Sequence, residues 1–411
     1  MSRELKDSGI AWIGEIPKGW NICRIKDVIC LYTGNSIKDE EKDIYTDKLD
    51  AYPYISTKDI DVVYYTINYD NGLYTKKDDI LFKNADIGSS LVCIEGGSAG
   101  KKKAFVEQKI SFVNKLCCFA PKNINGKYSF YHLCSSNFEF QFNKFVTGLI
   151  GGVSVSVLKN FIMILPPLLE QQKIAEFLDR KCAEIDELVA LQEKMIEELK
   201  AYKQSVITEA VTKGLNPNAP MKDSGIEWIG EIPEHWEVKR IKFIGKAENG
   251  LTYTPTDVCD VNEGTLVLRS SNIQNGKLVF DDNVYVRSMP ESLRVQVGDI
   301  IICSRNGSAS LVGKSALVEN DIDATFGAFM MRFRSNHNCK YINFLLTATI
   351  SHYKQLFTTT TINQLTIGLI NNISMPFIND KIEQQQIADY LDKKCAEIDE
   401  LVAVKQQKIE T

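Results

Sequence analysis

The sequence has little of what metal-dependent and nucleophilic enzymes need. It contains four histidines, and none has another histidine four residues away or a Cys-x-x-Cys pair beside it, which argues against a zinc site. These are His132, His235, His337 and His352. The glycine fingerprint of dinucleotide-binding folds is also absent. We therefore expect a chain that performs no chemistry itself. A histidine that meets a cysteine or serine only in the folded chain is the alternative.

Long hydrophobic runs are missing too. No stretch reaches the ~18 uncharged apolar residues that a membrane span requires. The first seven residues lack the apolar core of a secretory signal peptide. The eleven cysteines are odd in number, scattered, and include the adjacent pair Cys117-Cys118. In a chain this long, that pattern favours buried thiols in a reducing compartment over a disulfide framework. We expect a cytoplasmic protein.

One segment of the sequence matches the motif of a phosphate-binding loop only in part. The segment Glu95–Lys102 has Glu where a P-loop needs its first Gly, and Lys where it needs Ser or Thr. A glycine-rich turn is the better interpretation. Lys101, Lys102 and Lys103 then become candidates for contacts with a phosphate backbone, with a solvated run of charge as the alternative. The Pro166-Pro167 pair lacks the preceding Asn or Asp of an amino-methyltransferase motif, and it indicates a rigid entry into a helix.

The length of 411 residues, 44% hydrophobic and 25% charged, suits two globular domains with connecting elements. The net charge of −5 is unevenly distributed. Residues 170–204 carry nine acidic and six basic side chains, and residues 383–411 carry seven and four. The rest of the chain is therefore close to neutral. This distribution removes an objection to nucleic-acid binding without indicating it.

Two blocks of the sequence occur twice. Residues 6–26, KDSGIAWIGEIPKGWNICRIK, match residues 222–242, KDSGIEWIGEIPEHWEVKRIK, at 15 of 21 positions. Residues 170–190, EQQKIAEFLDRKCAEIDELVA, match residues 383–403, EQQQIADYLDKKCAEIDELVA, at 17 of 21. The offsets are 216 and 213 residues, so the chain is a tandem duplication. Its four tryptophans stand at the same spacing in both copies, and we interpret them as packing anchors.

The segments between these blocks, residues 29–165 and 245–378, share little identity. Short β-branched and aromatic runs broken by Gly, Asn and Asp predict mainly β structure with some helix. We match the strand and turn at Tyr54–Ile60 with Leu266–Ile273, and the acidic turn and apolar strand at Asp78–Asn84 with Gly298–Gly307. A common frame with dissimilar residues predicts surfaces for two different targets. Neutral drift of two equivalent domains is the alternative.

Two long helices are predicted, over residues from about 168 to 210 and from about 382 onward. Their apolar residues recur in steps of three and four, which gives each helix a heptad-like seam. Gly214, Pro217 and Pro220 end the first helix. The residues that we expect to pack the seams are Ile174, Leu178, Ile185, Leu188, Ile387, Leu391, Ile398 and Leu401.

The fold class that follows is α+β. We expect mainly β domains at residues 1–165 and 214–381, and spacer helices at 166–213 and 382–411 that form an intramolecular antiparallel coiled coil. A helix of about 40 residues extends ~60 Å, and the seams are too long for one domain to cover. Two helices that fold back on their own domains are the alternative.

The repeated blocks resemble a known family. Lys222–Trp236, KDSGIEWIGEIPEHW, is similar to a highly specific hallmark of the specificity subunits of type I restriction–modification systems. Pro166–Ile174, PPLLEQQKI, resembles a second, moderately specific one. The resemblance covers essentially the whole chain. The second copy, Pro376–Gln384, departs from it with a single Pro and three inserted residues, which leaves the entry into the second helix open.

The resemblance implies a non-catalytic subunit that binds double-stranded DNA, one half of a bipartite site per target-recognition domain. It implies that the helices set the spacing of the half-sites and dock two methyltransferase (modification) subunits, which restriction (motor-nuclease) subunits join. S-adenosylmethionine, ATP and Mg²⁺ belong to those partners in this family, and none is expected in this chain.

Base recognition needs Arg, Lys, Asn, Gln or Ser on loops that reach the edges of a groove. In the second domain Arg269, Ser270, Asn272, Arg305 and Asn306 lie at expected strand-to-loop turns. In the first, Lys58, Lys83 and Asn84 are assigned the matching places. Thr359 and Thr360, in a run of four threonines, are candidates for phosphate contacts. A solvated surface is the alternative for each of these residues taken singly.

Two other classes of function stay open. A coiled-coil scaffold without DNA specificity predicts that the central domains are interchangeable. A DNA-modifying enzyme with an unrecognised site predicts methyl transfer or strand cleavage by the chain alone.

Overall fold

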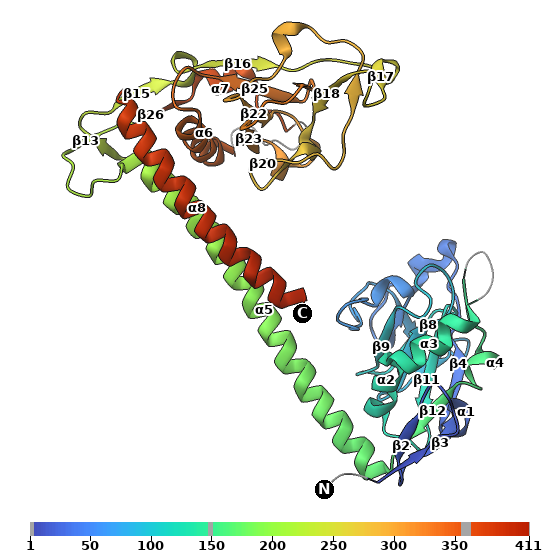
Figure 1. The fold of residues 1–411 in the computed structure, drawn as a ribbon. Coiled ribbons are helices and arrows are strands. Elements are labelled where there is room, and N and C mark those ends of the chain that lie inside the picture. Colours follow the sequence, from blue (N-terminus) through green and yellow to red (C-terminus); the bar gives the residue numbers. More distant parts are fainter. Residues whose placement is uncertain (1–3, 147–150, 355–362, 411) are drawn as a thin grey trace. The chain divides into compact units, whose positions relative to one another are not determined.

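The computed structural model describes residues 4–146, 151–354 and 363–410. The chain divides into two compact units, Met1–Glu187 and Leu188–Thr411, called unit 1 and unit 2 below. The colours of Figure 1 follow the chain from one unit to the other through the long helix α5 (Leu168–Lys213). Within the described ranges, no helix is long and apolar enough to cross a membrane. Thr359 and Thr360 lie outside these ranges.

Unit 1 is built from two four-stranded sheets, two small strand pairs and helices. One sheet has the order β4-β11-β8-β9 and the other β6-β5-β10-β7, in which β5 and β10 run parallel. The strands are β1 (Leu5–Asp7), β2 (Glu15–Pro17), β3 (Asn21–Arg24), β4 (Ile29–Thr33), β5 (Ala51–Ile55), β6 (Tyr74–Lys76), β7 (Asn84–Ala85), β8 (Ser90–Cys93), β9 (Lys103–Phe105), β10 (Ile110–Phe112), β11 (Leu116–Pro121) and β12 (Ile162–Leu165). The helices are α1 (Ile25–Val28), η1 (Asp39–Tyr45), η2 (Thr57–Asp59), α2 (Gly126–Cys134), α3 (Ser136–Phe145) and α4 (Val155–Leu158).

Unit 2 repeats this plan. Its sheets have the orders β16-β25-β22-β23 and β17-β21-β18-β24, and β18 and β24 run parallel as β5 and β10 do. The strands are β13 (Met221–Asp223), β14 (Glu231–Pro233), β15 (Glu237–Arg240), β16 (Lys246–Asn249), β17 (Val258–Cys259), β18 (Thr265–Leu268), β19 (Ile273–Gln274), β20 (Lys277–Leu278), β21 (Tyr285–Val286), β22 (Ile300–Cys303), β23 (Ser315–Leu317), β24 (Ala324–Phe326), β25 (Met330–Arg334) and β26 (Ser374–Phe377). The helices are η3 (Ile241–Phe243), η4 (Pro255–Asp257), η5 (Ser270–Asn272), η6 (Glu291–Leu293), η7 (Ala309–Leu311), α6 (Cys339–Tyr353), α7 (Ile367–Asn372) and α8 (Lys381–Glu410).

Each unit has two hydrophobic clusters because the strands of its first sheet alternate between two buried faces. In unit 1 Cys117 and Phe119 pack with Phe138 of α3, while Cys118 joins the cluster between the two sheets. This alternation explains how two adjacent cysteines are both buried. All eleven cysteines are free thiols, and five of them are buried; Cys30 and Cys182 are exposed, unlike the buried thiols that we expected.

The strand predicted at Asp78–Asn84 is wrong. Only Asn84 there belongs to a strand, and Ile80 and Leu81 are 96% and 70% exposed. Phe82 is buried, with its ring 5.4 Å from that of Tyr45. The strand of unit 1 that corresponds to β22 of unit 2 is β8, since each lies third in its sheet beside the strand that pairs with β4 or β16. The local pattern of acids followed by apolar residues therefore selected the wrong segment.

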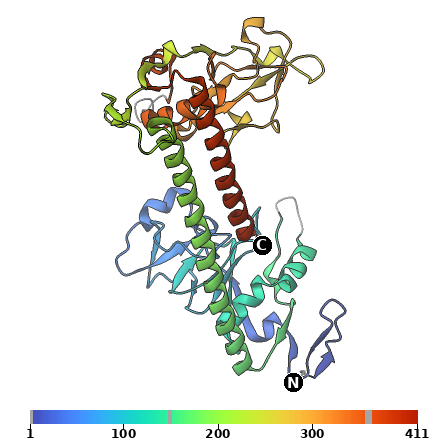
Figure 2. The same cartoon turned by 60° about the vertical axis from the view of Figure 1, so that its left-hand side comes forward.

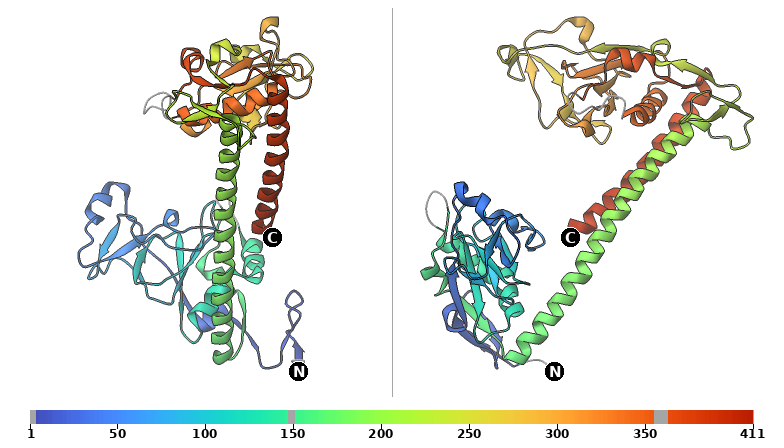
Figure 3. Two further views of the ribbon diagram at one scale, coloured as in Figure 1. Left: turned by 90° about the vertical axis from the view of Figure 1, so that its left-hand side faces the viewer. Right: turned by 180° about the vertical axis from the view of Figure 1, so that it is seen from behind.

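The two predicted long helices are present as α5 and α8. All views show α8 beside the C-terminal part of α5 (Figures 1, 2 and 3). They run antiparallel, because Lys203 Nζ lies 2.7 Å from both carboxylate oxygens of Asp399 and Lys405 Nζ lies 3.4 Å from Gln192 Oε1. The antiparallel pair is thus confirmed within unit 2.

The seam residues divide into packed and exposed ones. Ile387, Leu391 and Ile398 of α8 are buried in the largest cluster of unit 2, together with residues near the end of α5. Ile174 and Leu178 are half-buried on unit 1. The exposed seam residues are Ile185, Leu188 and Leu401, at 57%, 58% and 52% exposure. Each helix therefore packs partly on its own domain, as the alternative expectation held, and the pairing with α8 covers only part of α5.

The repeated blocks meet at the start of each long helix. Trp20 Nε1 donates to Glu170 Oε2 at 2.8 Å in unit 1, and Trp236 Nε1 donates to Glu383 Oε1 at 3.0 Å in unit 2. This contact ties the first block, which holds the tryptophan, to the second, which holds the glutamate. It accounts for the repetition of these residue types at matching places.

The glutamine after each glutamate makes a second duplicated contact. Gln171 accepts from the backbone N–H of Asn125 and donates to the carbonyl of Pro166. Gln384 does the same with Asn338 and Ile378. Asn125 and Asn338 are the N-caps of α2 and α6, whose first turns they hold through their side chains. The single Pro and the insertion in the second copy therefore leave the entry into the helix intact.

A buried histidine makes unit 1 sensitive to acid. His132 of α2 is 8% exposed and its Nε2 has no hydrogen-bond partner, and burial lowers its pKa from 6.5 to about 4. The unfolded chain binds this proton below pH 6.5 and the folded chain only near pH 4, so stability falls as the pH drops through this window. The shift corresponds to a loss of roughly 3 kcal/mol.

His132→Phe should remove that part of the acid sensitivity. Guanidinium unfolding at pH 7.5 and pH 4.5 measures the change in free energy for wild type and variant. We expect the wild type to lose more than the variant by roughly 3 kcal/mol. Equal losses for the two proteins would show that His132 is not the responsible group.

Candidate nucleic-acid interface

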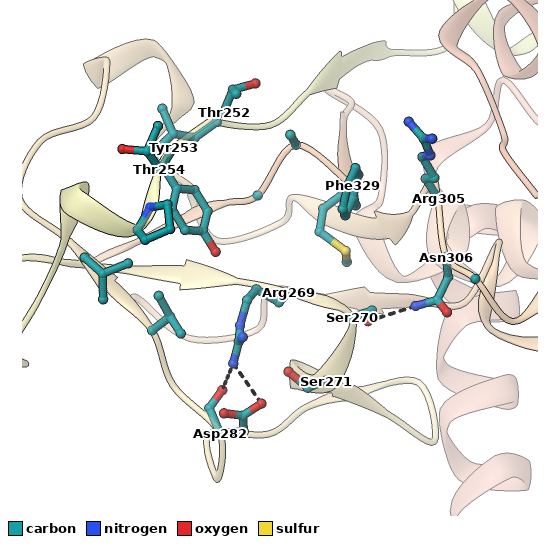
Figure 4. A pocket seen from close by; sticks show the side chains of 18 of the residues that line it. Thr252, Tyr253, Thr254, Arg269, Ser270, Ser271, Asp282, Arg305, Asn306 and Phe329 are labelled. Carbon is teal, nitrogen blue, oxygen red and sulfur yellow. Dashed lines mark hydrogen bonds and ion pairs between the residues drawn. The ribbon is translucent and has the colours of Figure 1, made fainter.

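Unit 2 contains a groove with a volume of about 1300 Å³ at the ends of several of its strands. The loops that line it follow β16, β18 and β22, and the turn between β24 and β25 closes it. Figure 4 shows Thr252, Tyr253 and Thr254 on one wall and Arg269, Ser270 and Ser271 across from them. Four of the residues predicted from the sequence line this groove together: Arg269, Ser270, Arg305 and Asn306.

Arg269 is tied to the domain by Asp282. Its Nη2 lies 2.7 Å from Asp282 Oδ2 and donates to the backbone oxygen of the same residue at 3.0 Å (Figure 4). Its Nε is buried without a hydrogen-bond partner. The charge of Arg269 is thus balanced inside the groove, and its main effect is to order the loop that carries Asp282.

Of the two cations among the described residues that line the groove, Arg305 is the exposed one. It is exposed, and its guanidinium lies 5.4 Å from the ring centre of Phe329, which is itself 60% exposed. A guanidinium over an aromatic face is held in place by a cation–π interaction worth about 0.5–1 kcal/mol at an exposed site. The guanidinium of Arg305 forms no hydrogen bond with another described residue, and its orientation is restricted by Phe329.

Asn306 and Ser270 form a fixed pair beside it. Asn306 Nδ2 donates to Ser270 Oγ at 3.1 Å, and Asn306 Oδ1 accepts from the backbone N–H of Ser308. The two side chains hold the loops after β18 and β22 together. Both residues line the groove.

Asn272 is not a surface residue. It is 1% exposed, its Oδ1 accepts from the backbone N–H of Arg269, and its Nδ2 donates to the backbone oxygen of Val279. It closes the turn after β18, as Asp59 closes the turn after β5 by accepting from Ser56. The prediction of Asn272 as a DNA contact is therefore wrong, because its polar groups satisfy buried backbone.

In unit 1 the structure brings Lys102 to the turn that carries Lys58, since Lys102 Nζ donates to the carbonyl of Thr57. Lys58 is exposed on η2, directly after β5, where Ser271 stands in unit 2. Lys83 is exposed and Asn84 is half-buried, with its Oδ1 accepting from Ser111 at 2.7 Å. Because β8 and not this segment corresponds to β22, neither residue matches Arg305 or Asn306. Their assignment to the matching places is wrong.

Of the three consecutive lysines, one is fully at the surface. Lys101 is exposed. Lys102 Nζ donates to the carbonyl of Thr57 at 2.6 Å. Lys103 is 5% exposed, its Nζ lies 5.6 Å from the ring centre of Phe138, and burial lowers its pKa. Lys103 is therefore part of the interior, and only Lys101 is placed for a phosphate contact.

Several groove residues could not be recognised from the sequence. Phe329 and Tyr253 line the groove, but an aromatic residue in a β-rich segment looks like core. None of the four tryptophans lines the groove. Trp236 is fully buried, as expected of a packing anchor, whereas Trp12 is 37% exposed. Within residues 4–146, 151–354 and 363–410 there is no group of three or more His, Cys, Asp or Glu residues that could hold a metal ion.

Comparisons with known proteins agree with this arrangement. The family profile of the type I restriction modification DNA specificity domain matches residues 17–201 and again residues 233–411. The type I restriction enzyme MjaVIII specificity subunit of Methanocaldococcus jannaschii is 27% identical over 299 residues, which are 70% of this chain and 64% of that protein. The EcoKI specificity subunit of Escherichia coli is 31% identical over 183 residues, 41% of this chain and 38% of that protein. The chain thus spans less than two-thirds of the length of these relatives.

Two solved structures share the fold. One comes from a study of complex assembly and conformational transition of the type I R-M system, with a TM-score of 0.73, 15% identity, and coverage of 96% of this chain and 95% of that chain. The other is the HsdS subunit of Thermoanaerobacter tengcongensis, with a TM-score of 0.53, 15% identity, and coverage of 96% and 92%.

Proposed function

This chain belongs to the family of type I restriction modification DNA specificity proteins, and from that premise we propose that it is the non-catalytic subunit that selects a bipartite DNA site. Each unit binds one half of the site. The chain itself transfers no methyl group and cuts no DNA. The observation that carries the proposal is the groove of unit 2, where Arg305, Asn306 and Ser270 stand together on loops of a rigid β scaffold.

The chemistry of this groove suits double-stranded DNA. Arg pairs with guanine O6 and N7 in the major groove, and Asn pairs with adenine N6 and N7. Hydroxyl groups from Thr252, Thr254 and Ser271 add donors and acceptors along the walls, and such groups bind phosphate or base edges. Loops held by strands provide both the reach and the fixed geometry that base recognition needs.

The long helices are the proposed docking surface for two methyltransferase subunits, which a restriction subunit joins. The middle of α5 carries apolar side chains that are at least half exposed: Phe177, Ile185, Leu188 and Leu191. An exposed apolar row of this kind is typical of a surface that another protein covers. In this assignment S-adenosylmethionine, ATP and Mg²⁺ are bound by the partner subunits.

The experiment is to express the chain with its methyltransferase partner and to map methylated adenines in the host DNA. We expect one motif with two defined halves separated by a spacer of constant length. The chain purified alone should methylate nothing. Methylation that is independent of the chain would support a scaffold without specificity, and methyl transfer by the chain alone would support an enzyme; either result refutes the proposal.

A further inference from the structure

We infer that Glu95 of unit 1 and Arg305 of unit 2 occupy the same base-recognition position, and that they make the two half-sites differ there. Arg305 selects guanine, and Glu95 selects the amino group of cytosine. The inference rests on the proposed function, and it adds Glu95 as a specificity-determining residue that the sequence did not reveal.

The equivalence of the two positions follows from backbone hydrogen bonds. The strand that leads to each residue ends with the same cysteine: Cys93 N donates to Lys102 O at 2.9 Å, and Cys303 N donates to Lys314 O at 2.8 Å. Each cysteine thiol also faces the carbonyl two residues later, at 3.3 Å in Glu95 and 3.7 Å in Arg305.

The backbone contacts of Glu95 and Arg305, and of the residue before each, also correspond. The backbone N–H before Glu95 donates to Lys115 O at 3.0 Å, and the one before Arg305 donates to Phe329 O at 2.9 Å. The residues themselves form isolated antiparallel bridges, Glu95 with Gly152 and Arg305 with Gln364. No insertion or deletion separates the two segments from the cysteine to Ala99 or Ala309, and Gly97-Ser98-Ala99 matches Gly307-Ser308-Ala309 in the same register.

The lysines that close the two loops also correspond. Lys102 Nζ donates to the carbonyl of Thr57 in the turn after β5, and Lys314 Nζ donates to that of Ser270 in the turn after β18. Each lysine therefore fixes the loop that carries Glu95 or Arg305 against the neighbouring loop. The scaffold holds the position in the same place in both units, and only the side chain differs.

Both side chains are available to a ligand. Glu95 and Arg305 are exposed, and among the described residues neither forms an ion pair. Beside Glu95 stands the exposed Lys115, where unit 2 has Phe329. A lysine next to a carboxylate offsets its repulsion from DNA phosphates, which lets an acidic residue approach a groove edge.

Whether the side chain donates or accepts hydrogen bonds then determines which base it selects. A guanidinium only donates, and guanine offers two acceptors, O6 and N7, in the major groove. An ionised carboxylate only accepts, and the cytosine N4 amino group donates there. The two units therefore require opposite partners at one equivalent base pair, so a symmetric site with the same base in both halves is not recognised.

The test uses the full chain with its methyltransferase and a series of DNA duplexes in which each base pair of the motif is replaced in turn. We compare Glu95→Gln, Glu95→Ala and Arg305→Ala with the wild type. Each change should reduce discrimination at one base pair of one half-site by about 5- to 150-fold. The other half-site should stay unchanged and serves as an internal control. Glu107→Gln and Arg240→Gln, which alter exposed residues elsewhere in units 1 and 2, should change nothing.

The outcomes separate this inference from the function on which it rests. If both Glu95 variants keep wild-type discrimination at every base pair while the wild type recognises a bipartite motif, Glu95 is not a specificity determinant. The same is true if a Glu95 change and an Arg305 change alter the same half-site. If the wild type shows no sequence preference, the proposed function itself fails. Thermal unfolding of each variant verifies that the change in discrimination does not come from a loss of structure.

Discussion

Four residues inserted into α5 between Glu184 and Ile185 should give a subunit that no longer recognises its original site and instead recognises one with a spacer about two base pairs longer. Four helical residues add ~6 Å at 1.5 Å each, and a base pair of DNA occupies ~3.4 Å. Both half-sites should keep their bases, because the strands and loops of the two units are unchanged. Since a site with the wrong spacing engages only one unit at a time, the effect on the original motif is close to all-or-none.

The insertion is placed where α5 is exposed and does not pack against α8. Ala201, in the last third of the predicted spacer helix 166–213, lies where α8 packs against α5 and Lys203 pairs with Asp399. An insertion there would disturb that pairing. Residues 181–188 are exposed, so added turns at Glu184 meet no neighbouring helix.

Methylome mapping of the insertion variant measures the new spacer directly. A matched insertion of four residues in the exposed turn between Lys48 and Leu49 lengthens the chain but not the helix, and it should leave the spacer as it was. A helix insertion that keeps the original spacer would show that α5 does not set the distance between the half-sites.

Asp299→Ala should destabilise unit 2 by about 3–5 kcal/mol, the usual result of removing one partner from a buried ion pair. Asp299 is 1% exposed and accepts from Arg334 through both carboxylate oxygens, at 2.6 and 2.7 Å. It also accepts from the backbone N–H of Gln296 at 2.8 Å. Without the carboxylate, Arg334 loses its partner and Arg332, which is 2% exposed and also pairs with Glu248, loses a nearby negative charge.

Thermal unfolding of the full chain measures this effect, and the transition of unit 2 should fall by about 10 °C. Asp323→Ala provides the matched control, because it removes an aspartate from an exposed pair with Arg294 in the same unit. Exposed pairs contribute about 0–1 kcal/mol. If both variants unfold at similar temperatures, the buried network does not hold unit 2 together.

The part of the fold that the repeated blocks form was predictable, because the sequence of each block occurs twice in the chain. Residues that recur at fixed spacing must make the same contacts in both copies, and the Trp–Glu and Gln contacts at the start of α5 and α8 are those contacts. Apolar periodicity also located both long helices, since a helix is defined by local spacing. The extent to which α8 covers α5 is not local, and the exposure of Ile185 and Leu188 did not follow from the seam.

The candidate site was only partly predictable, because the contacts that form it are not local in the sequence either. Arg269 and Arg305 were found because they follow apolar strands, but Asn272 follows one too and turns inward to bond the backbone. Its spacing of three from Arg269, repeated by Ser56 and Asp59, is the signature of a side chain that closes a turn. The correspondence of Glu95 with Arg305 depends on which strands pair. Its trace in the sequence is short, the match of Gly97-Ser98-Ala99 with Gly307-Ser308-Ala309, and the acidic turn at Asp78–Asn84 was matched in its place.

The most direct test of the account is to replace residues 245–378 with the corresponding segment of another specificity subunit and to map the methylated motif with the methyltransferase present. The repeated blocks and both long helices stay in place. We predict a hybrid motif in which one half-site changes, the other is retained, and the spacer keeps its length. A motif that is unchanged, or one in which both halves change, would contradict the claim that each unit recognises its own half of the site.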